Sequence, residues 1–319
     1  MRATTIAGLI LLALAMAVPV LGIYPVFMMK LLCFGMFACA FNLLLGFAGM
    51  LSFGHAAFFG ISAYVTAWLR LDLGWPVEAA ILAGIASAAT LGLIVGGLAI
   101  RRQGIYFAMV TLALAQCVYF FCLQAPFTGG ENGIEGVPRG TLLGLVPLQS
   151  DTVMFYFVLG SFVAVFLLIQ RIVHSPYGQV LKAIRENESR AISLGYDVNR
   201  YKLIAFVLSA AIAGFAGSLK ALTLGLASLS DVEQTASGEV VLMTLLGGIG
   251  TFFGPLAGAG LVVTMQEYLS DRVGAWVTVI IGGIFIACVM AFRRGLVGEI
   301  EAWVALRRPS KGSNKRPLA

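Results

Sequence analysis

The sequence predicts an all-α integral membrane protein with about ten transmembrane segments. Composition is the first indication, because 60% of the 319 residues are hydrophobic and only 11% are charged, more apolar side chain than one soluble core can bury. The second is that mostly apolar runs recur, each about 17 to 25 residues and long enough as a helix to cross about 30 Å of hydrocarbon. Runs such as LIAFVLSAAIAGFAG do not alternate, so transmembrane β-strands are not expected.

The predicted segments make the chain a single transmembrane domain, residues 1–319. The first segment is expected to stay in the protein, because only Arg2 precedes it and no clear small-residue cleavage site follows it, unlike a secretory signal. The ten segments lie at roughly residues 6–23, 26–46, 50–69, 77–99, 104–123, 153–171, 203–225, 238–249, 254–270 and 276–292.

The basic residues predict the orientation of the chain, because lysine and arginine accumulate in short cytoplasmic loops. With ten segments, sixteen of the 21 lysines and arginines fall on one side, in residues 101–102, 171–202 and 293–316 together with Arg2. That side is expected to be the cytoplasm. Both termini then lie there, including a basic tail at 296–319.

Two of the segments are interrupted by glycine. The first interruption is LLGFAGMLSFGHAAFFG, residues 44–60, and the second is GGIGTFFGP, residues 247–255. Glycine and proline weaken helical continuity and let backbones approach closely. LLGFAG at 44–49 matches LLGGIG at 245–250 in four of six positions, which indicates a weak internal pseudo-repeat of two halves. Paired interruptions of this kind mark a transport pathway near the bilayer midplane, and the alternative is a pair of glycine-lined packing helices.

Three of the ionisable residues inside predicted segments, His55, Lys30 and Lys220, raise the question of a role, because a charge there is costly. His55 either lines a permeation path or is a neutral imidazole hydrogen-bonded to a neighbouring helix. Lys30 lies near a segment end and can extend its ammonium to the interface. Lys220 is deeper, and is either partnered inside the bundle or extended in the same way.

Residues 174–202, HSPYGQVLKAIRENESRAISLGYDVNRYK, form a hydrophilic segment between two apolar runs. Pro176 can begin a helix and Gly195 can end one, with a polar turn at 186–189 between two short amphipathic pieces. Such pieces offer side chains to a soluble partner on the cytoplasmic face. The alternative is a basic helix that lies on anionic lipid, but the acidic residues of RENESR do not favour it.

Motifs for chemistry within this chain are missing. There is no G-x-x-x-x-G-K-[ST] phosphate loop, so the chain is not expected to bind or hydrolyse ATP by itself. The five cysteines and two histidines lack zinc-ligand spacing. We therefore expect no enzyme activity, no catalytic residue, no metal, no cofactor of its own and no nucleic-acid partner.

The sequence resembles a known transporter family over about residues 40–295. The resemblance is carried by LLLGFAGMLSFGHAAFFGISAY, SPYGQVLKAIRENESRAISLGYDVNRYKLIAF, AIAGFAGSL and LLGGIGTFFGPLAGA, which together look like the branched-chain amino acid ABC transporter permeases of the LivM type. It implies a permease subunit of an importer in the bacterial inner membrane, paired with a second homologous permease. It also implies two cytoplasmic ATPases, which bind the ATP, and a periplasmic solute-binding protein.

The substrates implied are branched-chain amino acids or related small solutes. Relatives with this pattern also handle urea, short amides or aromatic acids, and a secondary transporter remains an alternative class. The family's ATPase-coupling segment maps to Ala183, Arg185, Glu186, Asn187, Glu188, Ser189 and Gly195. Its glycine-rich motifs, read as a translocation pathway, map to Gly46, Gly49, Ser52, Gly54, His55, Gly247, Gly248, Gly250, Thr251, Gly254 and Pro255.

The loop 124–152 is expected to be periplasmic and to face the solute-binding protein. Glu131 and Glu135 are hypothesised to help that docking, because of their side of the membrane and the length of the loop. Its glycine and proline content is equally typical of a plain surface loop.

Overall fold

The computed structural model describes residues 24–142, 144–274, 277–291 and 295–299. The predicted first segment, 6–23, and most of the tail 296–319 lie outside these residues. The longer helices are α2 (Pro25–Asn42), α3 (His55–Leu71), α4 (Val77–Ala99), α5 (Ile105–Gln124), α6 (Asp151–His174), α7 (Pro176–Glu186), α9 (Val198–Leu224), α10 (Gln234–Gly247), α11 (Gly254–Val273) and α12 (Val277–Ala291). Helix α8 (Glu188–Ser193) is shorter, and a π-helical turn, η1 (Leu43–Phe47), extends α2.

The remaining elements are small. They are the 3₁₀ turns η2 (Pro126–Thr128), η3 (Gly130–Asn132) and η4 (Leu229–Asp231) and the strands β1 (Ile134–Glu135), β2 (Thr141–Leu142), β3 (Val146–Pro147) and β4 (Leu226–Ala227). Strand β1 pairs antiparallel with β4, and β2 with β3. The all-α expectation is therefore confirmed for the described residues, because each strand has only two residues.

Five stretches in the described part of the chain have both the length and the apolar character to cross a membrane. They are Pro25–Phe47, α4, α5, α6 and α9. Helices α3, α10 and α12 are shorter, at 17, 14 and 15 residues. The total of ten crossings therefore stays a prediction.

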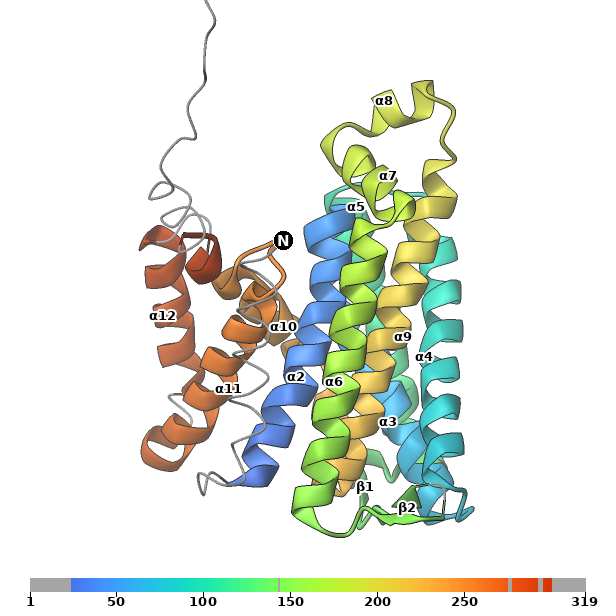
Figure 1. Cartoon of the computed structure of the whole chain (residues 1–319), viewed down its shortest axis with the longest axis vertical. Coiled ribbons are helices and arrows are strands. Elements are labelled where there is room, and N and C mark those ends of the chain that lie inside the picture. Colours follow the sequence, from blue (N-terminus) through green and yellow to red (C-terminus); the bar gives the residue numbers. More distant parts are fainter. Residues whose placement is uncertain (1–23, 143, 275–276, 292–294, 300–319) are drawn as a thin grey trace, which may run out of the picture.

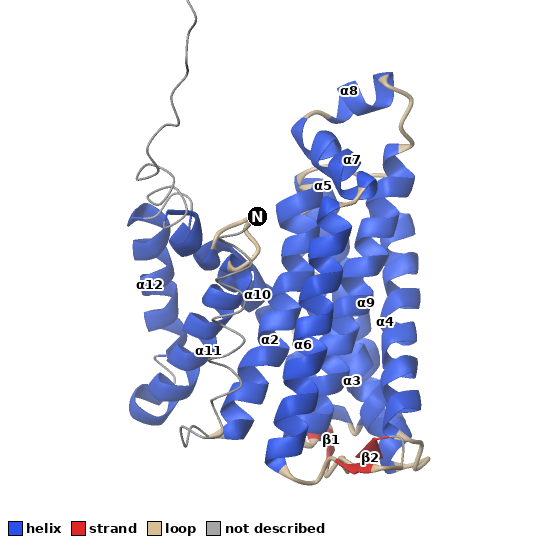
Figure 2. Ribbon diagram, viewed as in Figure 1, coloured by secondary structure: helices blue, strands red, loops and turns tan. Residues whose placement is uncertain are grey.

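Helix α9 occupies the middle of the bundle and packs against α2, α3 and α4 (Figure 1). Helix α6 packs on α2, and α10 and α11 pair with each other beside α2, next to α12. Figure 2 shows the same arrangement by element type, with α7 and α8 at one end and the strands at the other. We call these the α7 end and the β1 end.

Among the described residues, two of the basic stretches that the sequence assigned to one side, 101–102 and 171–202, lie together at the α7 end (Figure 1). Gln103, next to Arg101 and Arg102, donates to Glu188 of α8 at 3.0 Å, which places the α4–α5 loop at the α7 end. Gly295, which follows the predicted last segment, lies close to the backbone of Gly248 between α10 and α11. Which compartment each end faces remains a prediction.

The loop 124–152 is held firmly on the β1 end. Besides the β1–β4 pairing, the Val137 amide donates to the Gly225 carbonyl at 3.0 Å. Arg70 donates to the Pro138 carbonyl through Nε and Nη2, and Arg139 pairs with Asp151 and donates to the Thr223 carbonyl. These bonds give the loop a fixed shape, so it is more than a loose connection.

Candidate functional site

The first glycine break lies between α2 and α3. The predicted segment 50–69 begins later than expected, at His55, because residues 49–54 leave the helical path. Gly49 has φ of +72°, a left-handed conformation that residues with a Cβ rarely adopt. The Ser52 hydroxyl oxygen then accepts the Gly54 amide at 3.3 Å, one residue before α3 begins. Ser52, Gly54 and His55 are all buried.

The second break separates α10 from α11, so the apolar run 238–270 is two helices and not one. A Cβ on Gly247 would collide with the carbonyl oxygen of Gly254, so the two helix ends can meet only as glycines. Gly250 has φ of +76°. Thr251 Oγ1 donates to the Gly248 carbonyl at 2.8 Å and accepts the Gly254 amide at 3.1 Å, and the buried Pro255 follows in the first turn of α11.

The two breaks share two features of local geometry. Gly49 and Gly250, matched in LLGFAG and LLGGIG, are both left-handed. Ser52 and Thr251 each accept the amide of the glycine at the start of the next helix. The likeness extends only over these short stretches, and the pseudo-repeat of two whole halves stays a prediction.

The breaks also touch each other through Asn42, which the sequence analysis did not single out. Its Oδ1 accepts the Gly250 amide at 2.9 Å and its Nδ2 donates to the Thr251 carbonyl at 2.9 Å. Asn42 is 2% exposed. An amide inside an uninterrupted apolar run was the available signal, because such a group needs partners when it is buried.

The hydrophilic segment forms two helices, as its pattern predicts. Ser175 caps α7, with its Oγ accepting the Gly178 amide at 3.3 Å, and Asn187 caps α8 by accepting the Arg190 amide at 3.0 Å. Gly195, just beyond the end of α8, has φ of +87°. Burial raises the pKa of Tyr177, whose hydroxyl donates to the Tyr201 carbonyl and ties α7 to α9.

The residues mapped to ATPase coupling divide between two faces. Arg185 donates to the Gly46 carbonyl of the first break. Glu188 pairs with Lys202 of α9 at 2.7 Å, so it too is turned toward the bundle. Arg185 is itself exposed despite this contact, as are Ala183, Glu186, Asn187, Ser189 and Gly195.

A cavity of about 500 Å³ lies at the α7 end. Its walls come from residues at the first break (48–53), from the α4–α5 loop and the first turn of α5 (100–108), and from Ile184, Arg185, Glu188 and Lys202. Of the residues mapped to a pathway, Gly49 is part of this wall. Gly46 and Gly250 lie beside it through Arg185, and the others support the two breaks from within the protein.

His55 is packed as a structural residue. Its Nε2 lies 3.1 Å from Ser209 Oγ on α9, and Ser209 in turn donates to the Ala40 carbonyl of α2. The rings of Phe37 and Phe41 flank the imidazole. Of the two readings of His55, this contact favours the hydrogen bond to a neighbouring helix.

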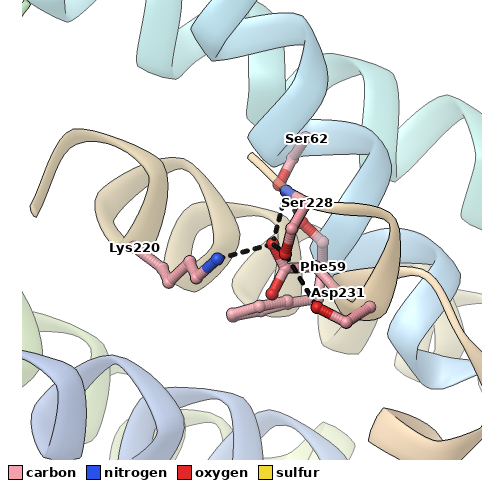
Figure 3. A network of polar contacts seen from close by, with 6 residues as sticks. Phe59, Ser62, Lys220, Ser228 and Asp231 are labelled. Carbon is pink, nitrogen blue, oxygen red and sulfur yellow. Dashed lines mark hydrogen bonds and ion pairs between the residues drawn. The ribbon is translucent and has the colours of Figure 1, made fainter. Parts of the chain in front are cut away.

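Lys220 is partnered, which resolves its two readings in favour of the bundle. Its ammonium lies 2.6 Å from Asp231 Oδ2, and the two side chains are 5% and 8% exposed. Ser228 donates its amide and its hydroxyl to the same carboxylate at 3.1 and 3.0 Å (Figure 3). Lys30, near the start of α2, pairs with Glu267 of α11 at 2.7 Å.

The matching family and three relatives of this chain are all named as permease components of transport systems. The family model described as "Branched-chain amino acid transport system / permease component" matches residues 25–289. The chain is 32% identical over 280 residues to the high-affinity branched-chain amino acid transport system permease protein LivM of Salmonella typhimurium, and 31% identical to that of Escherichia coli; each alignment covers 80% of this chain. It spans only 65% of the length of these curated relatives.

A further relative is named for a different solute. It is the autoinducer 2 import system permease protein LsrC of Klebsiella pneumoniae, 30% identical over 220 residues, which covers 65% of this chain and 59% of the relative. No solved structure matches the chain significantly. The family match spans both glycine breaks and the hydrophilic segment, and the chain therefore belongs to the permease components of the branched-chain amino acid transport family.

Proposed function

We propose that this chain is the permease subunit of an ABC importer of the bacterial inner membrane that brings branched-chain amino acids into the cytoplasm. The support is the family membership and the two LivM relatives. A second homologous permease completes the pathway, and a periplasmic solute-binding protein delivers the solute. ATP is bound by two separate ATPases and not by this chain.

The observation that carries the proposal is an exposed surface on α7 and α8 that we call the docking face. Ile192 and Leu194 are 57% and 69% exposed there, beside the exposed Glu186, Ser189 and Arg190. Apolar side chains surrounded by charged ones are typical of a protein interface, whereas a lipid-bound basic helix has no use for acidic residues. The docking face is therefore assigned to an ATPase subunit.

ATP drives the cycle through this contact. An ATPase dimer that closes on ATP shifts the permease only if it binds the outward-open and inward-open states with different affinity. The ATPase binds the docking face, and its closure then moves the α7 end relative to the rest of the bundle.

The test is co-purification of the ATPases with single variants of the complex. Ile192→Asp is expected to remove them, because it buries a charge at the centre of the contact. Leu145→Asp is the matched control, since Leu145 is 83% exposed at the β1 end. Retention of the ATPases by Ile192→Asp would remove the docking face from this role, and ATP-independent uptake that resists vanadate would favour a secondary transporter instead.

Topology and substrate have their own measurements. A cysteine introduced for Ser193 is expected to resist a membrane-impermeant thiol reagent added outside intact cells, whereas one introduced for Glu131 reacts.

In uptake competition, leucine is expected to compete far better than urea or benzoate. A urea, amide or aromatic acid permease would reverse that order, and the LsrC relative shows that cargo differs among relatives of this chain.

The loop 124–152 is assigned to the solute-binding protein. Glu131 and Glu135 are exposed on a loop whose shape is fixed by β1, Arg70 and Arg139. Replacing both glutamates with alanine is expected to lower uptake when the binding protein is limiting. Unchanged uptake under that condition would leave the loop as a plain surface element.

A further inference from the structure

One side chain of the hydrophilic segment reaches into the bundle and contacts both glycine breaks. Arg185 donates from Nη1 to the carbonyl of Gly46. Its Cγ lies 2.9 Å from where a Cβ on Gly49 would be, and its Nη1 lies 3.4 Å from the same position on Gly250. We call Arg185, Gly46, Gly49, Gly250 and Asn42 the arginine junction.

The arginine junction depends on the absence of side chains at its glycines. A Cβ on Gly46 would collide with Asn42 Oδ1 and would lie 2.7 Å from the Gly250 amide nitrogen. Gly49 and Gly250 are left-handed, so their backbones turn away and leave room for the arginine. The close approach that lets a single guanidinium contact both breaks is therefore built into the sequence of each break.

The two breaks are linked to each other as well as to Arg185. Asn42 Oδ1 accepts the Gly250 amide and Asn42 Nδ2 donates to the Thr251 carbonyl, each at 2.9 Å. A displacement of one break therefore strains two hydrogen bonds to the other. Arg185 adds the only described connection from α7 to the Gly46 carbonyl, across 139 residues of sequence.

Arg185 and its neighbour Glu186 are both exposed, and Arg185 is the one that donates a hydrogen bond to a glycine break. Glu186, directly after Arg185, is exposed and belongs to the docking face. The hydrogen bond to Gly46 therefore assigns Arg185 to the bundle, whereas Glu186 is assigned to a partner. Within one turn of α7, Glu186 therefore serves ATPase binding, and Arg185 serves the contact with the glycine breaks.

We propose that Arg185 is a positioning residue that transmits displacement of α7 into both glycine breaks, through the Gly46 carbonyl and the left-handed Gly49 and Gly250. The inference rests on the proposed function, because it needs an ATPase that moves α7. It gives Arg185 a role distinct from ATPase binding, and it makes the breaks the parts of the bundle that respond first. The cavity wall at 48–53 then changes shape with each cycle.

The test uses the complete importer in liposomes, with three readouts: ATPase co-purification, solute uptake, and the rise in ATP hydrolysis when solute-loaded binding protein is added. Arg185→Met keeps length and removes every donor, whereas Arg185→Gln keeps a donor for the carbonyl. We expect Arg185→Met to retain the ATPases but to lose uptake and the stimulated hydrolysis by about tenfold or more, the loss expected for one charge-assisted hydrogen bond. Arg185→Gln and Arg185→Lys are expected to recover part of both.

Controls separate this inference from the proposed function. Arg171→Ala removes an exposed arginine at the same end of the bundle and is expected to change none of the readouts. Ile192→Asp should lose the ATPases altogether. If Arg185→Met also loses the ATPases, or keeps stimulated hydrolysis and uptake within about twofold, the transmitting role is wrong while the importer assignment stands. If the wild-type chain binds no ATPase, the proposed function itself fails.

Folding does not confound the result. Each variant is compared with the wild type in its thermal transition in detergent and in its yield of assembled complex. A Gln variant that is as stable as the Met variant but transports better supports transmission, because a merely structural role would lower stability and transport together. Equal transport by these two variants overturns the proposal.

Discussion

The two ends of the bundle are held by different kinds of contact. At the β1 end, Lys220 and Asp231 form an ion pair that is 5% and 8% exposed, and β1 and β4 close over the neighbouring turn. At the α7 end, Arg185 contacts a neutral carbonyl, the Lys202–Glu188 pair is 10% and 27% exposed, and a cavity of about 500 Å³ lies between the elements. The comparison teaches that the β1 end resists rearrangement, whereas the α7 end can exchange partners with water at lower cost.

The largest expected effect follows from breaking the buried pair at the β1 end. Asp231→Leu leaves the Lys220 ammonium without its partner and is expected to cost about 3–5 kcal/mol of folding free energy. The double variant Lys220→Met with Asp231→Leu should recover most of that loss, because no charge then stays buried. Reversible unfolding in detergent measures both. A single variant within about 1 kcal/mol of the wild type would mean that the β1 end is no more rigid than the α7 end.

A smaller loss is expected from closing a glycine contact near the α7 end. Gly247→Ala drives a methyl group into the Gly254 carbonyl and should cost about 1–3 kcal/mol, the range for overpacking. Gly238→Ala is a matched control on the same helix, because nothing lies within 4 Å of its Cβ position. That control should be neutral or stabilising by about 0.5–1 kcal/mol, since alanine is the better helix former. Thermal transitions of the two variants would show the contrast, and equal shifts would contradict it.

The smallest effects belong to pairs that water reaches. A double-mutant cycle on Lys202 and Glu188 should give a coupling energy of about 1–2 kcal/mol, within the range for residues in direct contact, because both side chains are mostly buried. The pair Lys30–Glu267, which is 29% and 50% exposed, should give less than about 1 kcal/mol. A Lys30–Glu267 coupling as large as that of Lys202–Glu188 would show that exposure does not order these contacts.

Local sequence predicted much of the fold, and tertiary contacts supplied the rest. Pro176, Asn187 and Gly195 marked the ends of α7 and α8, because caps and turns depend on neighbouring residues. The glycine runs marked both breaks. The start of α3 at His55 was missed, because residues 50–54 are apolar enough to look helical and leave that path only through Gly49 and the Ser52 cap.

The candidate site was harder to predict than the fold. Arg185 and Glu188 were grouped with Glu186, yet the first two make contacts with the bundle, and the packing of α7 on η1 and α9 brings these contacts about. The contact of Asn42 with Gly250 joins residues 208 apart in sequence. The sequence did not predict which residue pairs with Lys220, because Asp231 reaches it only after the chain turns at Gly225.

Helix α9 connects the two ends of the bundle as a single rigid element. Its 27 residues form one uninterrupted helix, about 40 Å long at 1.5 Å per residue. It carries Lys202, paired with α8, near one end and Lys220, paired with η4, near the other. A stiff helix held by an ion pair near each end cannot tilt at one end without changing the geometry of the pair at the other. A displacement of α8 would therefore alter the Lys220–Asp231 contact directly through α9, and not through a series of side chains between them.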